Sequence, residues 1–320
     1  MESGIKNKLD AKQLKAVIRQ VFNESVQEAR ELSDGWANTA YSILLGSGRK
    51  VVLKAAPVKD TKVMRYENNI MTAEVMAMKL IGGKDILPVP RIYAHDDSFS
   101  ILNSEYFIME YLEGEPLNKI RDSLSMEETA SIQYELGVCN RRLNEIEGSQ
   151  FGYFGQVNRT GNGWKETFCK MLLDVLADGR DAGVELPVDY SQIERELHGA
   201  SDVLSGVQRP YFVHWDLWDG NIFINDGRIS GIIDFERAIW GDPLMEFYFS
   251  HFAKPEPFLE GYGQSAFSQE ELARRALYDL YLDLILVIEC PYRHYEDDNH
   301  IKWAYQNMET GWSRFLHSLG

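Results

Sequence analysis

The stretch 213-VHWDLWDGNIFI-224 places carboxylates among apolar residues that otherwise have the pattern of strand and core. A second stretch, 231-GIIDFERAIWGDP-243, does the same. Together they hold five carboxylates within 27 positions, beside a histidine and an amide: Asp216, Asp219, Asp234, Glu236 and Asp242, with His214 and Asn221. Because an unpaired charge is costly inside a strand or core, this concentration of acids indicates a chemical site.

The residues between the two stretches predict how they meet. Residues 221–224 predict a short strand, the turn at 225–227 reverses the chain, and residues 229–234 predict the returning strand. The return brings Asp234 beside Asn221, so that a carboxylate and an amide oxygen converge as a hard cation requires. A short loop after Val213 leaves Asp216 exposed nearby.

Metal-dependent phosphoryl transfer needs this combination of groups. A residue must face the acceptor hydroxyl, oxygen ligands must hold Mg²⁺, and a lysine must grip the nucleotide phosphates. Protein kinases supply the first two as H-R-D-x-x-x-x-N followed by D-F-G. Here His214-Trp215-Asp216 is followed by Asn221 at the same interval, and Asp234-Phe235-Glu236 comes 13 residues after that.

The two motifs resemble those of the aminoglycoside phosphotransferase family, a branch of the protein-kinase-like fold that includes choline, fructosamine and macrolide kinases. The family signature is roughly H-x-D-x-x-x-x-N, then I-D-x-[ED]-x-x-x-x-G-D-P. This sequence has H-W-D-L-W-D-G-N and I-D-F-E-R-A-I-W-G-D-P. The resemblance implies an α+β, two-lobed fold. An N-terminal lobe with an antiparallel sheet and helices would precede a larger, mainly helical C-terminal lobe that carries short catalytic β segments.

The resemblance also implies roles for single residues. Asp216 would be the catalytic aspartate that orients or deprotonates the acceptor hydroxyl, and Asn221 and Asp234 would bind Mg²⁺. His214 would be structural, and Asp242 would be the carboxylate that holds the catalytic loop. For two further acids the expectations are weaker: Asp219 faces solvent, and the role of Glu236 stays open.

The N-terminal part should bind ATP or GTP. Lys54, which ends the apolar strand 51-VVLKA-55, resembles the lysine that grips the phosphates. Glu74 on the following helix would pair with it, and Glu67 is the alternative. The phosphate-covering loop is expected between residues 33 and 41, where Asn38 or Thr39 could donate to phosphate.

A connector between the lobes is expected in 107-FIMEYLEGEPL-117. By resemblance, backbone groups around Glu110 and Leu112 would bind the purine edge, and Met109 would lie against the base. The predicted division is therefore a nucleotide-binding lobe at residues 1–112 and a catalytic and acceptor-binding lobe at 113–320.

Periodicity predicts the main elements. We expect helices over 10–31 and 66–81, strands over 40–46, 50–56 and 105–112, helices from capping boxes at Ser125 and Ser268, and a last helix over 299–317.

Charge and cysteine content limit the partners. The net charge is −16, so nucleic acid is not expected as a partner. Residues 1–112 carry a net of +1 and residues 113–320 a net of −17. The three cysteines are widely spaced, the N-terminal residues have no apolar signal region, and no apolar run is long enough for a membrane span. We therefore expect a cytoplasmic protein.

Several acceptors remain open. The acidic C-terminal part favours a cationic acceptor such as an aminoglycoside, contacted by Glu289, Glu296, Asp297 and Asp298. Kinases of choline-, sugar- or homoserine-like metabolites are the alternatives, as is a nucleotide-binding pseudoenzyme. A protein substrate is not expected, because only seven residues separate Asp234 from Asp242 and leave no room for an activation loop.

Overall fold

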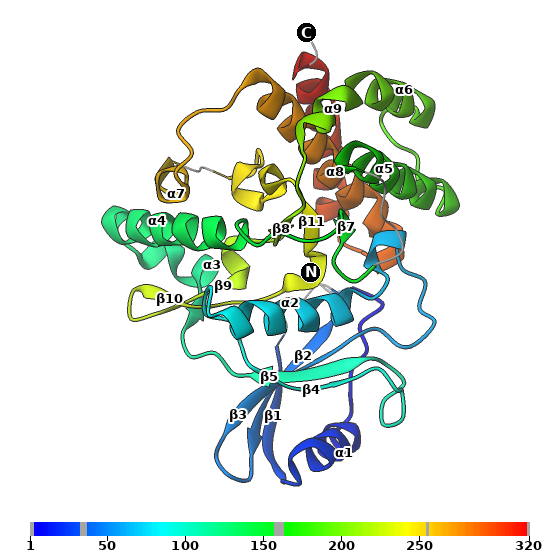
Figure 1. Ribbon diagram of the computed structural model, residues 1–320. Coiled ribbons are helices and arrows are strands. Elements are labelled where there is room, and N and C mark those ends of the chain that lie inside the picture. Colours follow the sequence, from blue (N-terminus) through cyan, green and yellow to red (C-terminus); the bar gives the residue numbers. More distant parts are fainter. Residues whose placement is uncertain (1–2, 33–36, 157–162, 254–255, 319–320) are drawn as a thin grey trace.

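The N-terminal part of the chain is built on a five-stranded antiparallel sheet. The computed structural model describes residues 3–32, 37–156, 163–253 and 256–318. In spatial order the strands are β1 (Val26–Leu32), β2 (Thr39–Leu45), β3 (Lys50–Ala55), β5 (Tyr106–Glu110) and β4 (Ile92–Asp96). Figure 1 shows this sheet as the lower half of the molecule, with the mainly helical half above it.

Helices cover both faces of this sheet. Successive side chains of a strand point to opposite faces, and in β3 Val51 and Leu53 join the core under α1 (Ala11–Phe22), whereas Val52 joins the larger core. That larger core includes the buried face of α2 (Ile70–Lys84), which lies between the sheet and the C-terminal half (Figure 1). The sheet is thus fixed against α2, the helix expected to carry an acidic partner for Lys54.

The C-terminal part is mainly helical and carries two small sheets. Its helices are α3 (Leu117–Ile120), α4 (Met126–Leu143), α5 (Trp164–Asp181), α6 (Tyr190–Ala200), α7 (Glu256–Tyr262), α8 (Gln269–Arg293) and α9 (Asp298–Ser318). One sheet has the order β10 (Arg228–Ile232), β9 (Ile222–Asn225), β6 (Glu115–Pro116), and the other β7 (Gly152–Tyr153), β11 (Ile239–Gly241), β8 (Tyr211–Val213). The α+β, protein-kinase-like architecture is confirmed. Over the described residues, no helix is both long and apolar enough to cross a membrane.

The chain changes sheets between Glu110 and Glu115. β5 ends at Glu110 in the large sheet, and β6 begins at Glu115 and pairs with β9 of the C-terminal part. We propose that the division into lobes falls in this connector, between residues 112 and 113.

The predicted helix over 10–31 is wrong beyond Phe22. Asn23 takes a left-handed conformation (φ 55°) that caps α1, and residues 26–32 form β1 at the edge of the sheet. The sequence 26-VQEAREL-32 is mostly exposed and charged, as is typical of an edge strand. The capping boxes at Ser125 and Ser268 are present and open α4 and α8 as expected.

Two glycines let α4 and α7 cross at backbone distance. A Cβ added at Gly137 would lie 2.1 Å from the carbonyl oxygen of Phe258, and one added at Gly261 would lie 2.0 Å from that of Tyr134. Both obstacles are backbone atoms, which cannot rotate away. The helices can therefore keep this distance only with glycine at the crossing.

We expect Gly137→Ala to lower the free energy of unfolding by about 1–3 kcal/mol, since overpacking forces the two backbones apart. Urea denaturation would measure it. The matched control is Gly199→Ala in α6, where the described residues place no atom within 4 Å of the added Cβ apart from its own helix backbone and chain neighbours. That variant should be neutral or more stable by about 0.5 kcal/mol, because alanine is favoured in a helix. Equal effects of the two substitutions on the free energy of unfolding would contradict the close approach of the α4 and α7 backbones at Gly137.

Candidate active site

The site is centred on Lys54, whose ammonium group lies among three carboxylates. Lys54 is on β3, and its Nζ is 2.7 Å from Glu74 Oε2 on α2. The same Nζ is 2.6 Å from Asp234 Oδ1 and 3.4 Å from Glu236 Oε2, in the segment that follows β10. Of the two candidate acids, Glu74 therefore contacts Lys54, whereas Glu67 pairs with Arg293.

The four groups change one another's protonation. Burial alone disfavours the ammonium of Lys54, but Asp234, Glu74 and Glu236 outweigh it and hold its pKa well above the ordinary value. Burial raises the pKa of Glu74 to about 8, against the opposing effect of Lys54. Burial also acts to raise the pKa of Asp234, yet Lys54 lowers it. Ligand oxygens of the three acids lie within 4.8 Å of one another. One lysine does not balance three carboxylates, and a divalent cation would.

Glu236 links this cluster to the start of β2. Asn38 Nδ2 donates to Glu236 Oε2 over 2.7 Å, and both residues line the cleft described below. Asn38 immediately precedes β2, in the segment expected to cover the phosphates; residues 33–36 of that segment lie outside the described part of the chain. Burial raises the pKa of Glu236, and the charge of Asp234 adds to the effect. Glu236 therefore connects the N-terminal part to the metal-binding candidates.

Asp216 lies on the 214–221 loop, whose backbone is fixed by a buried histidine. The backbone N–H of Asp216 donates to His214 Nδ1 over 3.2 Å, and His214 Nε2 donates to the carbonyl of Ile233 over 3.0 Å. Burial lowers the pKa of His214, and a neutral imidazole can accept at one nitrogen while it donates at the other. The structure thus places His214 where it supports the loop and does not face the cleft as a base.

The predicted hairpin brings Asn221 to both acids of the motif. Ile222 on β9 pairs with Ile232 on β10, and the backbone N–H of Ile233 donates to the carbonyl of Asn221 over 3.0 Å. Asp234 is the next residue, and it lines the same cleft as Asn221. Asn221 Nδ2 donates to the carbonyl of Asp216 over 2.8 Å. Burial raises the pKa of Asp216 to about 7; Arg237 opposes this rise, and the charge of Asp234 adds to it.

A residue that the motif did not indicate holds the loop in place. Glu246 is fully buried, and its two carboxylate oxygens accept the backbone N–H groups of His214 over 2.9 Å and Trp215 over 3.0 Å. Asn140 of α4 and Asn144, which caps the C-terminus of that helix, donate to the same carboxylate. Trp215 has a φ of 67°, a left-handed conformation that costs a non-glycine residue about 1 kcal/mol or more. Glu246 stabilises the loop in that conformation.

Asp242 is structural but supports a different element from the one expected. Its Oδ2 accepts from Arg274 Nε and Tyr278 OH, both over 2.8 Å, so it anchors α8. The contacts predicted for Asp242 with the loop are made by Glu246, four residues later. The sequence did contain an indication that Glu246 is a buried structural residue, because it is a lone acid in the apolar run 243-PLMEFYF-249.

Asp219 was expected to face solvent, but the structure shows its carboxylate paired with other side chains. Its carboxylate pairs with Arg121 and accepts from Tyr248 OH over 2.7 Å. Its side chain is 13% exposed. Asp219 therefore fixes the far end of the 214–221 loop to the segment after α3.

The expected connector lines the same cleft. A cavity of about 540 Å³ is lined by residues of both parts, among them Met109, Glu110 and Leu112 as well as Lys54 and Asp216. The backbone N–H of Glu110 already donates to the carbonyl of Arg91 over 2.8 Å. A contact from Glu110 to a base would therefore have to come from its carbonyl oxygen.

The other half of the cleft is formed by α8, α9 and the motif loops. Glu289, Arg237 and Arg293 line it, together with aromatic side chains. Of the four acids expected to meet a polyamine, only Glu289 is among the described residues that line the cleft. The others, Glu296, Asp297 and Asp298, are exposed. The acidity of the C-terminal part is thus mostly outside the cleft.

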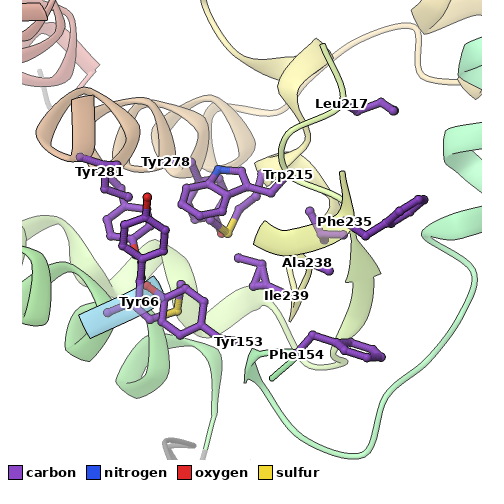
Figure 2. Packing of buried hydrophobic residues seen from close by; sticks show 14 of the residues in the cluster. Tyr66, Tyr153, Phe154, Trp215, Leu217, Phe235, Ala238, Ile239, Tyr278 and Tyr281 are labelled. Carbon is purple, nitrogen blue, oxygen red and sulfur yellow. The ribbon is translucent and has the colours of Figure 1, made fainter. Parts of the chain in front are cut away.

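The two tryptophans of the motif have different surroundings. Trp215 is 4% exposed, and its ring stacks on Tyr281 of α8 at 5.4 Å and meets the edge of Tyr66 at 6.4 Å. Figure 2 shows these three side chains in the buried cluster. Trp218 is partly exposed and lines the cleft. Both tryptophans line the cleft, but Trp215 is almost wholly buried and mainly a packing residue, whereas Trp218 is more available to a ligand.

Comparison with known proteins agrees with this geometry. Residues 28–278, more than three-quarters of the chain, match the model of the phosphotransferase enzyme family. The chain belongs to that family. Its fold is protein-kinase-like.

Solved structures of similar fold include three kinds of protein. The aminoglycoside phosphotransferase APH(2″)-IIa, bound to streptomycin and ATP, is 18% identical with a TM-score of 0.64, covering 97% of this chain and 99% of that one. APH(4)-Ia, bound to AMP-PNP and hygromycin B, is 18% identical with a TM-score of 0.65, covering 94% and 98%. A Thermobifida fusca protein named for fructosamine-3-kinase is 18% identical with a TM-score of 0.65, covering 95% and 100%. These identities establish the fold alone.

Curated relatives cover less of the chain. Two subtelomeric hrmA-associated cluster proteins of Aspergillus fumigatus strains are 24% identical over 123 residues. The match spans 38% of this chain and 23% of the length of those proteins.

We expect Glu246→Gln to lower the free energy of unfolding by about 2–4 kcal/mol, because it replaces one of two accepting oxygens with a donor inside a buried network. It should also lower kcat, since the 214–221 loop loses its support. Chemical denaturation and steady-state kinetics would measure both. Asp242→Asn is the control: it should destabilise the protein through α8 while kcat changes less than about threefold. Unchanged kcat in Glu246→Gln would contradict the role of Glu246.

Proposed function

We propose that the protein transfers the γ-phosphate of ATP or GTP to a hydroxyl group of a small molecule in a Mg²⁺-dependent reaction. The observation that supports this most is the convergence of Lys54, Asp216, Asn221 and Asp234 on one cleft. Each is the residue type that phosphoryl transfer needs at that place.

Lys54 is proposed to bind the nucleotide phosphates, with Glu74 holding its ammonium group in position. Asn221 and Asp234 would hold Mg²⁺, with Glu236 close enough to contribute. The donor set fits the ion, since carboxylate and amide oxygens are its usual protein ligands. When bound, the ion would neutralise charge on the phosphates during transfer.

Asp216 is proposed to orient the acceptor hydroxyl and accept its proton. The hydroxyl oxygen forms a bond to the γ-phosphorus, the bond from that phosphorus to the bridging oxygen breaks, and the nucleoside diphosphate leaves. A raised pKa, about 7 before nucleotide and cation bind, makes the carboxylate a better base than an ordinary aspartate.

The nucleotide base is proposed to lie at the connector. The carbonyl of Glu110 and the backbone of Leu112 would meet the purine edge, and Met109 would contact the ring. Asn38 would lie beside the phosphates. These four residues line the same cleft as Lys54, which supports the proposal.

The alternatives have less support. A pseudoenzyme would not need the full set of Lys54, Asp216, Asn221 and Asp234. Of the four acids expected to contact a polycationic aminoglycoside, only Glu289 is among the described residues that line the cleft. A neutral or singly charged metabolite agrees better with that arrangement. Action in the cytoplasm, inferred from the three cysteines, is part of the same proposal.

Asp216→Asn should lower the rate of phosphate transfer by about 10²–10⁴-fold, because it removes the base but keeps the shape of the side chain. Affinity for MgATP should change less than about threefold, since the substitution leaves Lys54 and the connector intact. The matched control is Asp226→Asn in the exposed β9–β10 turn, which should behave as wild type. Turnover in Asp216→Asn equal to that of the control would contradict the proposal.

A further inference from the structure

One face of α8 lines the acceptor half of the cleft and changes character along its length. Leu282, Leu286, Glu289 and Arg293 all line the cleft. Their spacing of four, three and four residues places them on one side of a helix. At a rise of about 1.5 Å per residue, this stripe is about 16 Å long. It is apolar at the leucines and charged at its C-terminal end.

Aromatic side chains continue the apolar end of the stripe. Phe247, Phe252 and Trp303 line the cleft with the leucines. The Phe252 ring lies 6.4 Å from that of Phe247 and 6.1 Å from that of Trp303. Trp303 is 41% exposed although it is a large apolar residue. A contiguous, partly exposed apolar surface inside a cleft is typical of a ligand site.

The charged end of the stripe is balanced. Arg237 is 3.4 Å from Glu289, and Arg293 pairs with Glu67. Each of these two glutamates is thus paired with an arginine, so the C-terminal end of the stripe does not offer a row of free carboxylates to a polycation. The guanidinium of Arg237 also lies 5.7 Å from the Trp215 ring, beneath the cleft.

One oxygen at this end still needs a donor. Glu289 is 1% exposed, and its Oε1 has no hydrogen-bond partner among the described residues. A buried acceptor without a partner is costly, and a ligand that donates one hydrogen bond would satisfy it. Glu289 is 3.4 Å from Arg237, which follows Asp234 by three residues and lines the same cleft as Asp216, so this polar end is the one near the reacting hydroxyl.

Granting the proposed phosphotransferase activity, we propose that the acceptor is an amphipathic alcohol with an apolar, ring-bearing body and at most one charge. Its reacting hydroxyl lies at Asp216, and a second hydrogen-bond donor at the same end donates to Glu289. Its apolar body extends along Leu286 and Leu282 to Phe252 and Trp303. These aromatic residues select the acceptor, and they do not take part in phosphate transfer.

The test compares ligands that differ only in the apolar body. Phenyl β-D-glucoside, methyl β-D-glucoside, other pairs of uncharged alcohols with and without a ring, choline and kanamycin are titrated into the full-length protein with MgADP. Binding is followed by tryptophan fluorescence and calorimetry, and phosphate transfer from MgATP is then assayed. Ring-bearing members should bind at least about tenfold more tightly than their partners and than kanamycin.

Two variants with matched controls locate the effect. Trp303→Ala should weaken binding of the ring-bearing alcohols about tenfold and raise their KM, with MgATP affinity and kcat little changed. Leu316→Ala, on the same helix and 39% exposed, should have no effect. Glu289→Gln should lower affinity for the hydroxyl end in both members of a pair, whereas Glu296→Gln should not.

The outcomes separate the two proposals. Normal MgATP binding together with tighter binding of kanamycin, or with no ring-bearing alcohol bound, would overturn the acceptor class and leave the phosphotransferase proposal standing. Equal effects of Trp303→Ala and Leu316→Ala would also overturn it. Failure to bind MgADP or MgATP would overturn the proposed function, and the acceptor class with it.

Discussion

The side chain of Lys54 is 12% exposed, and its ammonium group is held between carboxylates of α2 and of the segment after β10. A buried ammonium ion is stable only when it is paired, so β3, α2 and the C-terminal motif must keep their relative positions. The same arrangement leaves three acids against one lysine, which is unfavourable unless a proton or further positive charge is supplied, and the raised pKa values of Glu74 and Glu236 reflect this. The stability of this junction and its capacity for a metal–nucleotide complex therefore have one electrostatic origin.

The 214–221 loop depends on a second buried charge. Glu246 accepts two consecutive backbone N–H groups of the loop, one of them from Trp215 in its left-handed conformation. His214 ties the same loop to the end of β10 through Ile233. With these supports, Asp216 is presented to the cleft by a fixed backbone. Such preorganisation places a base before the substrate arrives.

The sequence was most informative where spacing determines geometry. The hairpin between Asn221 and Asp234, the Lys54 strand and the fold class could all be predicted, because motif intervals and strand periodicity act locally. Glu246 and the anchoring of Asp242 on α8 depend on contacts far apart in the chain, which no local pattern specifies. β1 was missed because its charged edge residues have no clear strand period. The acceptor prediction from net charge failed to locate the acids, most of which lie outside the cleft.

The most direct test of the electrostatic account is the affinity of AMP-PNP, measured by calorimetry with Mg²⁺ and with EDTA, in wild type and in Asp234→Asn. We predict that Mg²⁺ strengthens AMP-PNP binding to the wild type. The same increase in affinity should be about tenfold or more smaller in Asp234→Asn, because the cation loses a charged ligand. Equal affinity with Mg²⁺ and with EDTA in the wild type would contradict the claim that the Lys54 cluster receives a metal–nucleotide complex.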